Sequence, residues 1–200
     1  MKRKRYIFLS VLLCAPIWGS VIALAQSTQN AALAPPVVVS PADKAAIETF
    51  DKQVKDYIEL RNKAKETAPK LSKESTPEQI QAYKTALTLS LRNARANAKR
   101  GEFFRPETAD FIRRTLKIEF QGKDRQELRD QIFETETQGV VLRVNHPYAQ
   151  SAELSEMPAT LLTKLPKLPK DLRYRFVGKN MLLVDRESDL ILDYMPEALP

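Results

Sequence analysis

Cysteine, histidine and glycine are scarce in this chain of 200 residues, and their scarcity excludes several kinds of chemistry. There is one cysteine, Cys14, one histidine, His146, and only five glycines. An intrachain disulfide and a metal centre built on several cysteine or histidine ligands are therefore excluded. No glycine-rich phosphate loop, Gly-x-Ser-x-Gly motif or His-Glu-x-x-His motif occurs. The sequence predicts no cofactor and contains no motif of an enzyme class.

The beginning of the chain has the layout of a secretory signal peptide. Cationic residues at 2–5 precede an uncharged stretch over 6–25, which ends in a small-x-small cleavage site with Ala23 and Ala25. We predict export to the periplasm or secretion, with cleavage after Ala25 so that Gln26 begins the exported protein. The alternative is a membrane anchor formed by residues 6–25, because about 20 apolar residues can span a bilayer.

Removal of residues 1–25 would change the charge of the chain. The four charges in this segment are all positive, so the formal net charge falls from +7 to +3 (7 − 4). We therefore predict no nucleic-acid partner, since such partners favour a strongly basic protein. Cys14 would also be lost, which excludes thiolate catalysis. Residues 26–40, rich in Gln, Ser, Ala and Pro, predict a flexible tether before a single domain over 41–200.

The first part of this domain, residues 41–138, is predicted to form a bundle of about four helices. An N-cap residue followed by proline marks two helix starts, at Ser40 and Thr76. Apolar residues then recur at spacings of three and four, which indicates one buried face on each helix. The second helix is predicted to end at Gly101, and a third begins at Pro106. The first two helices should form an antiparallel hairpin.

The second part, residues 139–200, predicts a small antiparallel sheet, so the fold class is α+β. Residues 140–144 are a predicted strand, and a short helix is predicted over 157–165. Residues 165–170 are interpreted as an extended connector, because two prolines exclude regular helix there. The last 30 residues predict a three-stranded β-meander on which the helices pack.

Alternation of side chains predicts a register for this meander. A two-residue turn at Gly178 pairs Phe176 with Met181 and Tyr174 with Leu183. A four-residue loop after Asp185 then pairs Leu183 with Leu192. One face of the sheet becomes entirely apolar or aromatic, with Leu172, Tyr174, Phe176, Met181, Leu183, Leu190, Leu192 and Tyr194. The opposite face is mixed and carries Arg173, Arg175, Leu182, Val184, Ile191 and Asp193.

The mixed face is the candidate surface for a protein partner or a homodimer. Exposed apolar patches rimmed by polar groups often have this role, and such a patch would consist of Arg175, Leu182, Val184 and Ile191. The alternative is that the chain covers this face itself, with residues 140–144 or with the tail 196–200.

Two further candidate sites involve charged or titratable residues. Arg92, Arg95 and Lys99 share one face of the second predicted helix, which would suit a lipid headgroup, a lipopolysaccharide phosphate or an acidic protein. The alternative is a solvated face, or pairing with carboxylates of the fourth helix. His146, before Pro147, is the candidate general base or metal ligand, with an ordinary loop histidine as the alternative.

The C-terminal part resembles uncharacterised exported bacterial proteins. The resemblance covers about residues 140–200 and lies in the hairpin LRYRFVGKNMLLVDRESDLILDY and in a preceding Pro-x-x-Leu-Leu-x-x-Leu-Pro-x-Leu-Pro segment over 158–169. It implies export and no particular function. The hairpin is more distantly similar to that of periplasmic nickel and cobalt homeostasis proteins, which implies a metal-homeostasis role as one alternative. One histidine and, after removal of residues 1–25, no cysteine disfavour a selective nickel or cobalt site.

Together these features predict a non-enzymatic binding or adaptor protein of the bacterial periplasm or envelope. Its predicted partner is another envelope protein or an anionic envelope component. A hydrolase that uses His146 or a pair of carboxylates is the alternative from a different class.

Overall fold

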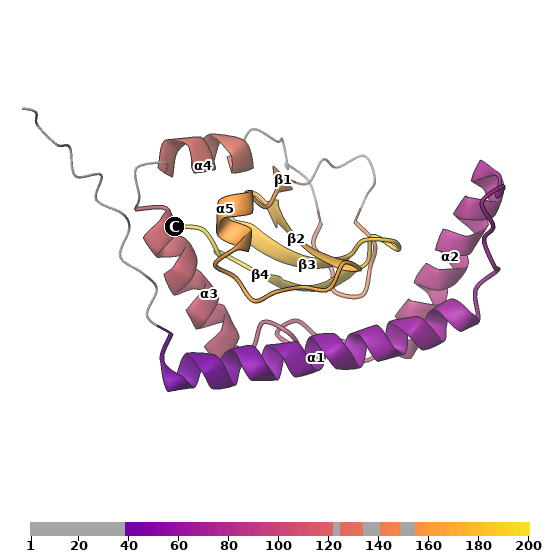
Figure 1. The fold of residues 1–200 in the computed structure, drawn as a ribbon, viewed down its shortest axis with the longest axis horizontal. Coiled ribbons are helices and arrows are strands. Elements are labelled where there is room, and N and C mark those ends of the chain that lie inside the picture. Colours follow the sequence, from indigo (N-terminus) through magenta and orange to yellow (C-terminus); the bar gives the residue numbers. More distant parts are fainter. Residues whose placement is uncertain (1–38, 122–124, 134–140, 149–154) are drawn as a thin grey trace, which may run out of the picture. The chain divides into compact units, whose positions relative to one another are not determined.

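The computed structural model describes four ranges of the chain: 39–121, 125–133, 141–148 and 155–200. The predicted cleavage site, with Ala23, Ala25 and Gln26, and residues 26–38 of the predicted tether lie outside these ranges. All described residues belong to one compact unit. The long helices precede the strands (Figure 1), which confirms the predicted α+β class. Within the described ranges, no helix is long and apolar enough to cross a membrane.

Helix α1 (Pro41–Glu66) is the longest helix and begins with the predicted cap. The hydroxyl of Ser40 accepts from the backbone N–H of Asp43 (3.1 Å), and the Asp43 carboxylate accepts from the N–H of Ser40 (2.9 Å). This capping box bonds N–H groups that have no partner within the helix. The buried face of α1 consists of Asp43, Ala46, Phe50, Val54, Tyr57, Arg61 and Ala64.

The stability of the fold should depend on pH through Asp43. Hydrogen bonds from the Arg114 guanidinium and from Ser40 lower the pKa of this carboxyl from 3.8 to about 2. Because the folded pKa lies below the unfolded one, the stabilisation is present above about pH 4 and is lost as the pH falls toward 2. We expect Asp43→Asn to be less stable than the original protein at pH 7, with the difference shrinking at pH 2–3. Urea unfolding at both pH values measures it, and a difference independent of pH would contradict the assignment.

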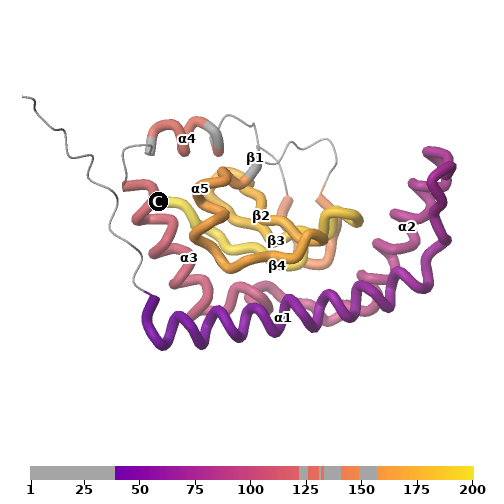
Figure 2. The backbone as a smooth tube through the Cα atoms, in the orientation of Figure 1, coloured from indigo at the N-terminus to yellow at the C-terminus, as the bar shows by residue number. Residues whose placement is uncertain are grey.

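Helices α2 (Pro77–Ala94) and α3 (Pro106–Glu119) both pack against α1, which runs from α3 at one end to α2 at the other (Figure 2). The predicted end of α2 at Gly101 is wrong, since the helix ends at Ala94. The amide of Asn145 donates to the carbonyls of Arg92 and Arg95 (2.9 Å each) and caps this end. A residue distant in the sequence therefore ends the helix early.

Two short helices and four strands complete the described fold. The helices are α4 (Arg125–Phe133) and α5 (Ala159–Leu162). The strands form one antiparallel sheet in the order β1-β2-β3-β4. The strands are β1 (Ser155–Glu156), β2 (Leu172–Val177), β3 (Asn180–Asp185) and β4 (Ile191–Met195). The predicted pairs of Phe176 with Met181 and of Tyr174 with Leu183 are confirmed. β1 adds a strand that the sequence did not predict.

The predicted register between β3 and β4 is wrong because β4 contains a bulge. Val184 pairs with Ile191, whereas Leu183 pairs with Asp193 instead of Leu192. Leu192 is thus an extra residue in the ladder, and side chains beyond it exchange faces.

This exchange moves Asp193 and Tyr194 away from the faces predicted for them. Tyr194 packs with the second face of the sheet, and Met195 takes its place in the main core. Asp193 pairs across the sheet with Leu183, a residue of the main core, and is buried on that side, where its carboxylate accepts from Phe103 and Phe104 N–H.

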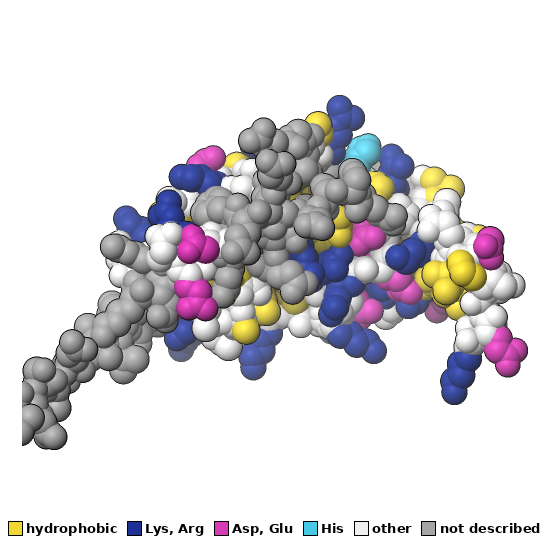
Figure 3. Space-filling view, turned by 90° about the horizontal axis from the view of Figure 1, so that it is seen from above, with side chains coloured by type: hydrophobic (Ala, Val, Ile, Leu, Met, Phe, Trp, Pro, Cys, Tyr) yellow, Lys and Arg dark blue, Asp and Glu magenta, His cyan; other side chains and the backbone are white. Residues whose placement is uncertain are grey.

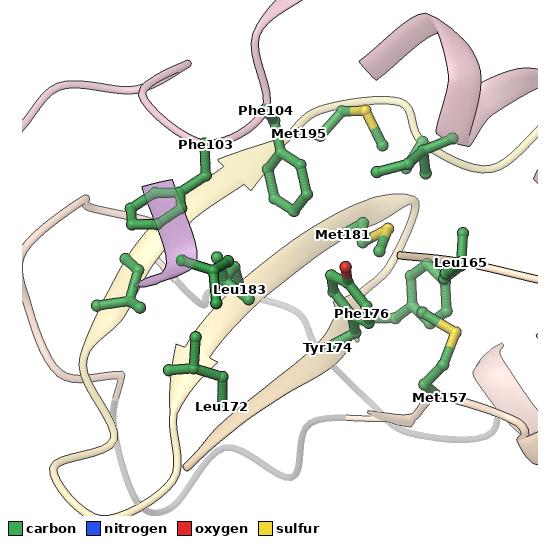
Figure 4. Close-up of a cluster of buried hydrophobic side chains, with 14 of the residues drawn as sticks. Phe103, Phe104, Met157, Leu165, Leu172, Tyr174, Phe176, Met181, Leu183 and Met195 are labelled. Atoms are coloured by element: carbon green, nitrogen blue, oxygen red, sulfur yellow. The ribbon is translucent and has the colours of Figure 1, made fainter. Parts of the chain in front are cut away.

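The main core lies between the first face of the sheet and the helices. Figure 4 shows Phe103 and Phe104, from the loop after α2, over the side chains of β3 and β4. The Phe103 ring meets Tyr57 edge-on with 6.2 Å between centres, and Phe104 stacks on Phe50 at 6.3 Å. Burial of each such side chain contributes about 1.5–3 kcal/mol. This core therefore holds α1 against the sheet.

Candidate functional site

The mixed sheet face is buried, which corrects the prediction of an exposed partner surface there. Leu182 and Val184 are 0 % exposed and Ile191 is 1 % exposed. Leu142, Tyr148 and Tyr194 pack against them with Val177. The structure thus supports the alternative in which the chain covers this face itself. The fourth residue of the predicted surface, Arg175, lies opposite Leu182 and donates to the carbonyl of Tyr174 (3.2 Å).

The covering segment is not the predicted strand, since residues 141–144 adopt no strand and Val140 lies outside the described ranges. It is attached to β4 a few residues later. Asn145 N–H donates to Ile191 O (2.8 Å), and Ile191 N–H donates to His146 O (3.0 Å). The tail takes no part in this cover, because Ala198 and Leu199 pack in the main core.

The predicted basic face of the second helix is also wrong, because Arg95 is buried beyond the end of α2. Its guanidinium donates to Leu192 O (3.0 Å) and to the Glu102 carboxylate (2.9 Å). It also lies 5.5 Å from the ring centres of Tyr57 and Phe103. Lys99 follows Arg95 outside the helix, so helical spacing does not align it with Arg92. The three cations therefore form no common surface.

His146 lies in an exposed loop, where the structure gives it no catalytic partner. Its Nδ1 is 3.1 Å from the carbonyl of Val144, and its Nε2 is 3.5 Å from a guanidinium nitrogen of Arg92. Figure 3 shows this single histidine at the surface between Lys and Arg side chains. No described carboxylate or hydroxyl bonds to the ring. The described residues also contain no group of three His, Cys, Asp or Glu side chains able to hold a metal ion.

The most buried charged cluster is built around Arg61, which is 2 % exposed. Its guanidinium donates to Asp185 (2.7 Å), Asp171 (3.0 Å) and Glu187. The hydroxyl of Tyr57 also donates to Asp185 (2.9 Å), and burial together with this carboxylate raises the pKa of Tyr57 above its ordinary value. The cluster joins α1 to the open end of the β2–β3 hairpin, where β2 begins and β3 ends. Because these charged groups already have partners within the cluster, we assign it a role in holding the fold together and not in binding a ligand.

A groove beside β2 has a different character. Its volume is about 510 Å³, and we call it the basic groove; it is lined by Met157, Leu162, residues 166–170, residues 172–175 and Arg186. Within this lining there is no carboxylate, histidine, serine or threonine. Cationic side chains and apolar or aromatic ones make up the wall.

The floor of the basic groove is held by the chain that precedes β2. β1 pairs only with Arg175 and Phe176, so it does not extend along the first half of β2. There the Tyr174 hydroxyl donates to Pro166 O (3.1 Å), and Leu172 N–H donates to Pro169 O (3.0 Å). Met157 and Leu165 lie near Tyr174 and Phe176 in the core (Figure 4). The predicted extended connector is therefore packed firmly onto the sheet.

This connector contains a repeat that the sequence-based interpretation missed. Residues 164–170 read Lys-Leu-Pro-Lys-Leu-Pro-Lys, with lysine at every third position. Lys164, Lys167 and Lys170 are all exposed, whereas Leu165 and Pro166 are buried. A period of three matches the three residues per turn of polyproline II, which places equivalent side chains along one edge. The spacing of the lysines was visible in the sequence and predicts such an edge.

The cations of the basic groove are only partly neutralised. Arg173 donates to the Asp189 carboxylate (2.9 Å) and to the Tyr148 hydroxyl (2.7 Å). Asp171 lies within the same stretch of chain, but Arg61 holds its carboxylate. Among the described residues, no carboxylate lies within ion-pair distance of Lys167, Lys170 or Arg186. Within the part of the chain that the structure describes, Lys167, Lys170 and Arg186 therefore give the groove and its rim an excess of positive charge.

Comparison with known proteins adds no relative, since no family model, no curated protein and no solved structure matches the chain. The resemblance of the C-terminal hairpin to exported bacterial proteins stays a prediction.

Proposed function

We propose that this chain is an exported, non-enzymatic binding protein of the bacterial envelope, and that it binds an anionic amphiphile in the basic groove. The observation that supports this function is the group of uncompensated cations, Lys167, Lys170 and Arg186, beside apolar side chains. Export is supported by the cationic and apolar layout of the first 25 residues. The predicted partner, an anionic envelope component, is the same as in the sequence analysis. Its binding site is now beside β2 instead of on α2.

The two kinds of side chain in the groove suit the two parts of such a ligand. Lysine ammonium groups are compact charges that attract a phosphate or carboxylate head. Met157, Leu162 and Leu168 would contact an alkyl chain, and burial of apolar area favours that contact. Tyr174 and Leu172 donate hydrogen bonds to the carbonyls of Pro166 and Pro169 and hold the floor of the groove. The protein therefore needs little ordering of this segment when the ligand binds.

A second groove, of about 400 Å³ between α2 and the β3–β4 loop, is a weaker candidate for an anion. Its lining combines Lys84 and Arg92 with Glu187 and Asp189, so charges of both signs face one another. The described lining of the basic groove has no acid, histidine, serine or threonine, and its Tyr174 hydroxyl is bonded to Pro166 O, which favours binding there over hydrolysis.

Calorimetric titration tests the proposal with the exported protein purified from cells that express the full chain. The probe is dihexanoylphosphatidylglycerol below its micelle concentration, compared with the zwitterionic dihexanoylphosphatidylcholine. We expect Lys167→Glu with Lys170→Glu to weaken binding of the anionic lipid at least tenfold, since each cation near such a ligand contributes about 1 kcal/mol.

The matched control reverses the same charges on α1, with Lys52→Glu and Lys55→Glu, which lie outside the groove and form no described ion pair. This control should bind like the original protein. Equal affinity for the two lipids, or equal weakening in both double variants, would contradict the proposal.

A further inference from the structure

We infer that the anionic amphiphile is recognised within a bilayer, so that the protein docks reversibly on a membrane surface rich in anionic phospholipid. The docking edge consists of Leu162, Lys164, Lys167, Lys170 and Arg186. This inference rests on the proposed function, and it adds the physical state of the ligand and the orientation of the protein.

The cationic residues of the docking edge extend beyond the lining of the basic groove. Lys164 is exposed and continues the sequence repeat of Lys167 and Lys170, with a turn after α5 at its position, yet it does not line the basic groove. A single ligand molecule in the groove would leave this cation unused. An extended anionic surface engages all of them at once, as polybasic segments do on anionic lipid.

The docking edge also contains an exposed apolar side chain. Leu162 closes α5, lines the basic groove and is 46 % exposed. Exposed leucine beside lysine is the pairing that peripheral proteins present to the boundary between headgroups and acyl chains. With one such leucine the apolar contribution is small, so binding is expected to depend mainly on charge and to be reversible.

Two carboxylates near these cations are held by arginines. Asp171 follows Lys170 in the chain, but its carboxylate is turned onto Arg61 at 3.0 Å. Asp189 is likewise held by Arg173 at 2.9 Å. Among the described residues, these two acids are thus paired with a buried or half-buried arginine and do not face an anionic surface unpaired.

Vesicle sedimentation tests the inference with the exported protein purified as above. Vesicles that contain phosphatidylglycerol and phosphatidylcholine are compared with vesicles of phosphatidylcholine alone. We expect sedimentation only with phosphatidylglycerol, and its loss in 1 M salt, where the screening length falls from about 10 Å to about 3 Å.

Lys164→Glu separates the bilayer from a soluble ligand, because Lys164 lies on the edge but outside the groove. We expect this variant to bind phosphatidylglycerol vesicles about fivefold more weakly, while its affinity for soluble dihexanoylphosphatidylglycerol stays unchanged. Leu162→Asp should also weaken vesicle binding. The variant with Lys52→Glu and Lys55→Glu should sediment like the original protein, and urea unfolding verifies that all variants are folded.

The outcomes distinguish this inference from the function on which it rests. Binding of the soluble lipid without binding of vesicles overturns bilayer docking and leaves the proposed function standing. Equal sedimentation of the original protein and Lys164→Glu also overturns the docking edge. Failure to bind both the soluble lipid and the vesicles removes both proposals, and an acidic protein partner would then be the next hypothesis to test.

Discussion

Replacement of Arg61 by leucine should lower the free energy of unfolding by about 3–5 kcal/mol, the range found when one partner of a buried ion pair is removed. Leucine fills much of the space but leaves Asp185, which is 0 % exposed, without its strongest counter-charge. Asp171 and Glu187 lose the same guanidinium. The cost comes mainly from Asp185, whose buried carboxylate loses its counter-charge where little water can replace it.

Urea unfolding and thermal melting measure this effect. For a domain of this size, a loss of 3–5 kcal/mol corresponds to a fall in melting temperature of roughly 10 °C. Arg113→Leu is the matched control, because Arg113 is partly exposed and pairs with the exposed Asp110 at 3.5 Å. Such pairs contribute about 0–1 kcal/mol. A loss below 1 kcal/mol in Arg61→Leu would show that water solvates the cluster.

Asp193→Ala should lower the free energy of unfolding by about 3–5 kcal/mol as well, but for a different reason. The Asp193 carboxylate accepts from the backbone N–H groups of Gly101 (2.9 Å), Phe103 (2.8 Å), Phe104 (2.9 Å) and Tyr194 (2.8 Å). Two of these bonds are fully buried, and each buried donor left without an acceptor costs about 1–3 kcal/mol. The alanine variant also leaves the loop after α2 without its attachment to β4.

Amide hydrogen exchange adds a local measurement to the unfolding experiment. In Asp193→Ala, the amides of Phe103 and Phe104 should exchange much faster than in the original protein, because their acceptor is gone. Asp110→Ala is the control, since the Asp110 side chain is 71 % exposed and accepts only from Arg113. Unchanged protection of Phe103 and Phe104 would contradict the role assigned to Asp193.

Two arginines, Arg61 and Arg95, illustrate why sequence patterns predicted helices and strands better than they predicted sites. In the sequence, Arg61 and Arg95 look like ordinary exposed arginines of helices. In the structure both are buried, because carboxylates or carbonyls from β3, β4 and their loops meet the guanidinium groups. Contacts between residues far apart in the chain cannot be read from local spacing, so the predicted basic face of α2 did not form.

For the basic groove, part of the relevant information is local in the sequence. The repeat of Lys164, Lys167 and Lys170 is local, and its period of three is visible in the sequence, although the sequence-based interpretation did not use it. No local pattern shows which of the cations lack a carboxylate partner in the folded protein. That depends on Arg61 holding Asp171 and on Asp189 holding Arg173.

The amino-acid sequence by itself determined the α+β class, the starts of α1 and α2 at Ser40 and Thr76, and the pairing across the turn at Gly178. These features depend on caps, periodicity and turn residues, which act over a few positions of the chain. Only the tertiary structure decided the end of α2, the bulge in β4, the burial of the second sheet face and the place of the basic groove. Each of these depends on hydrogen bonds, charges and apolar contacts between distant segments, whose partners are settled only when the chain folds.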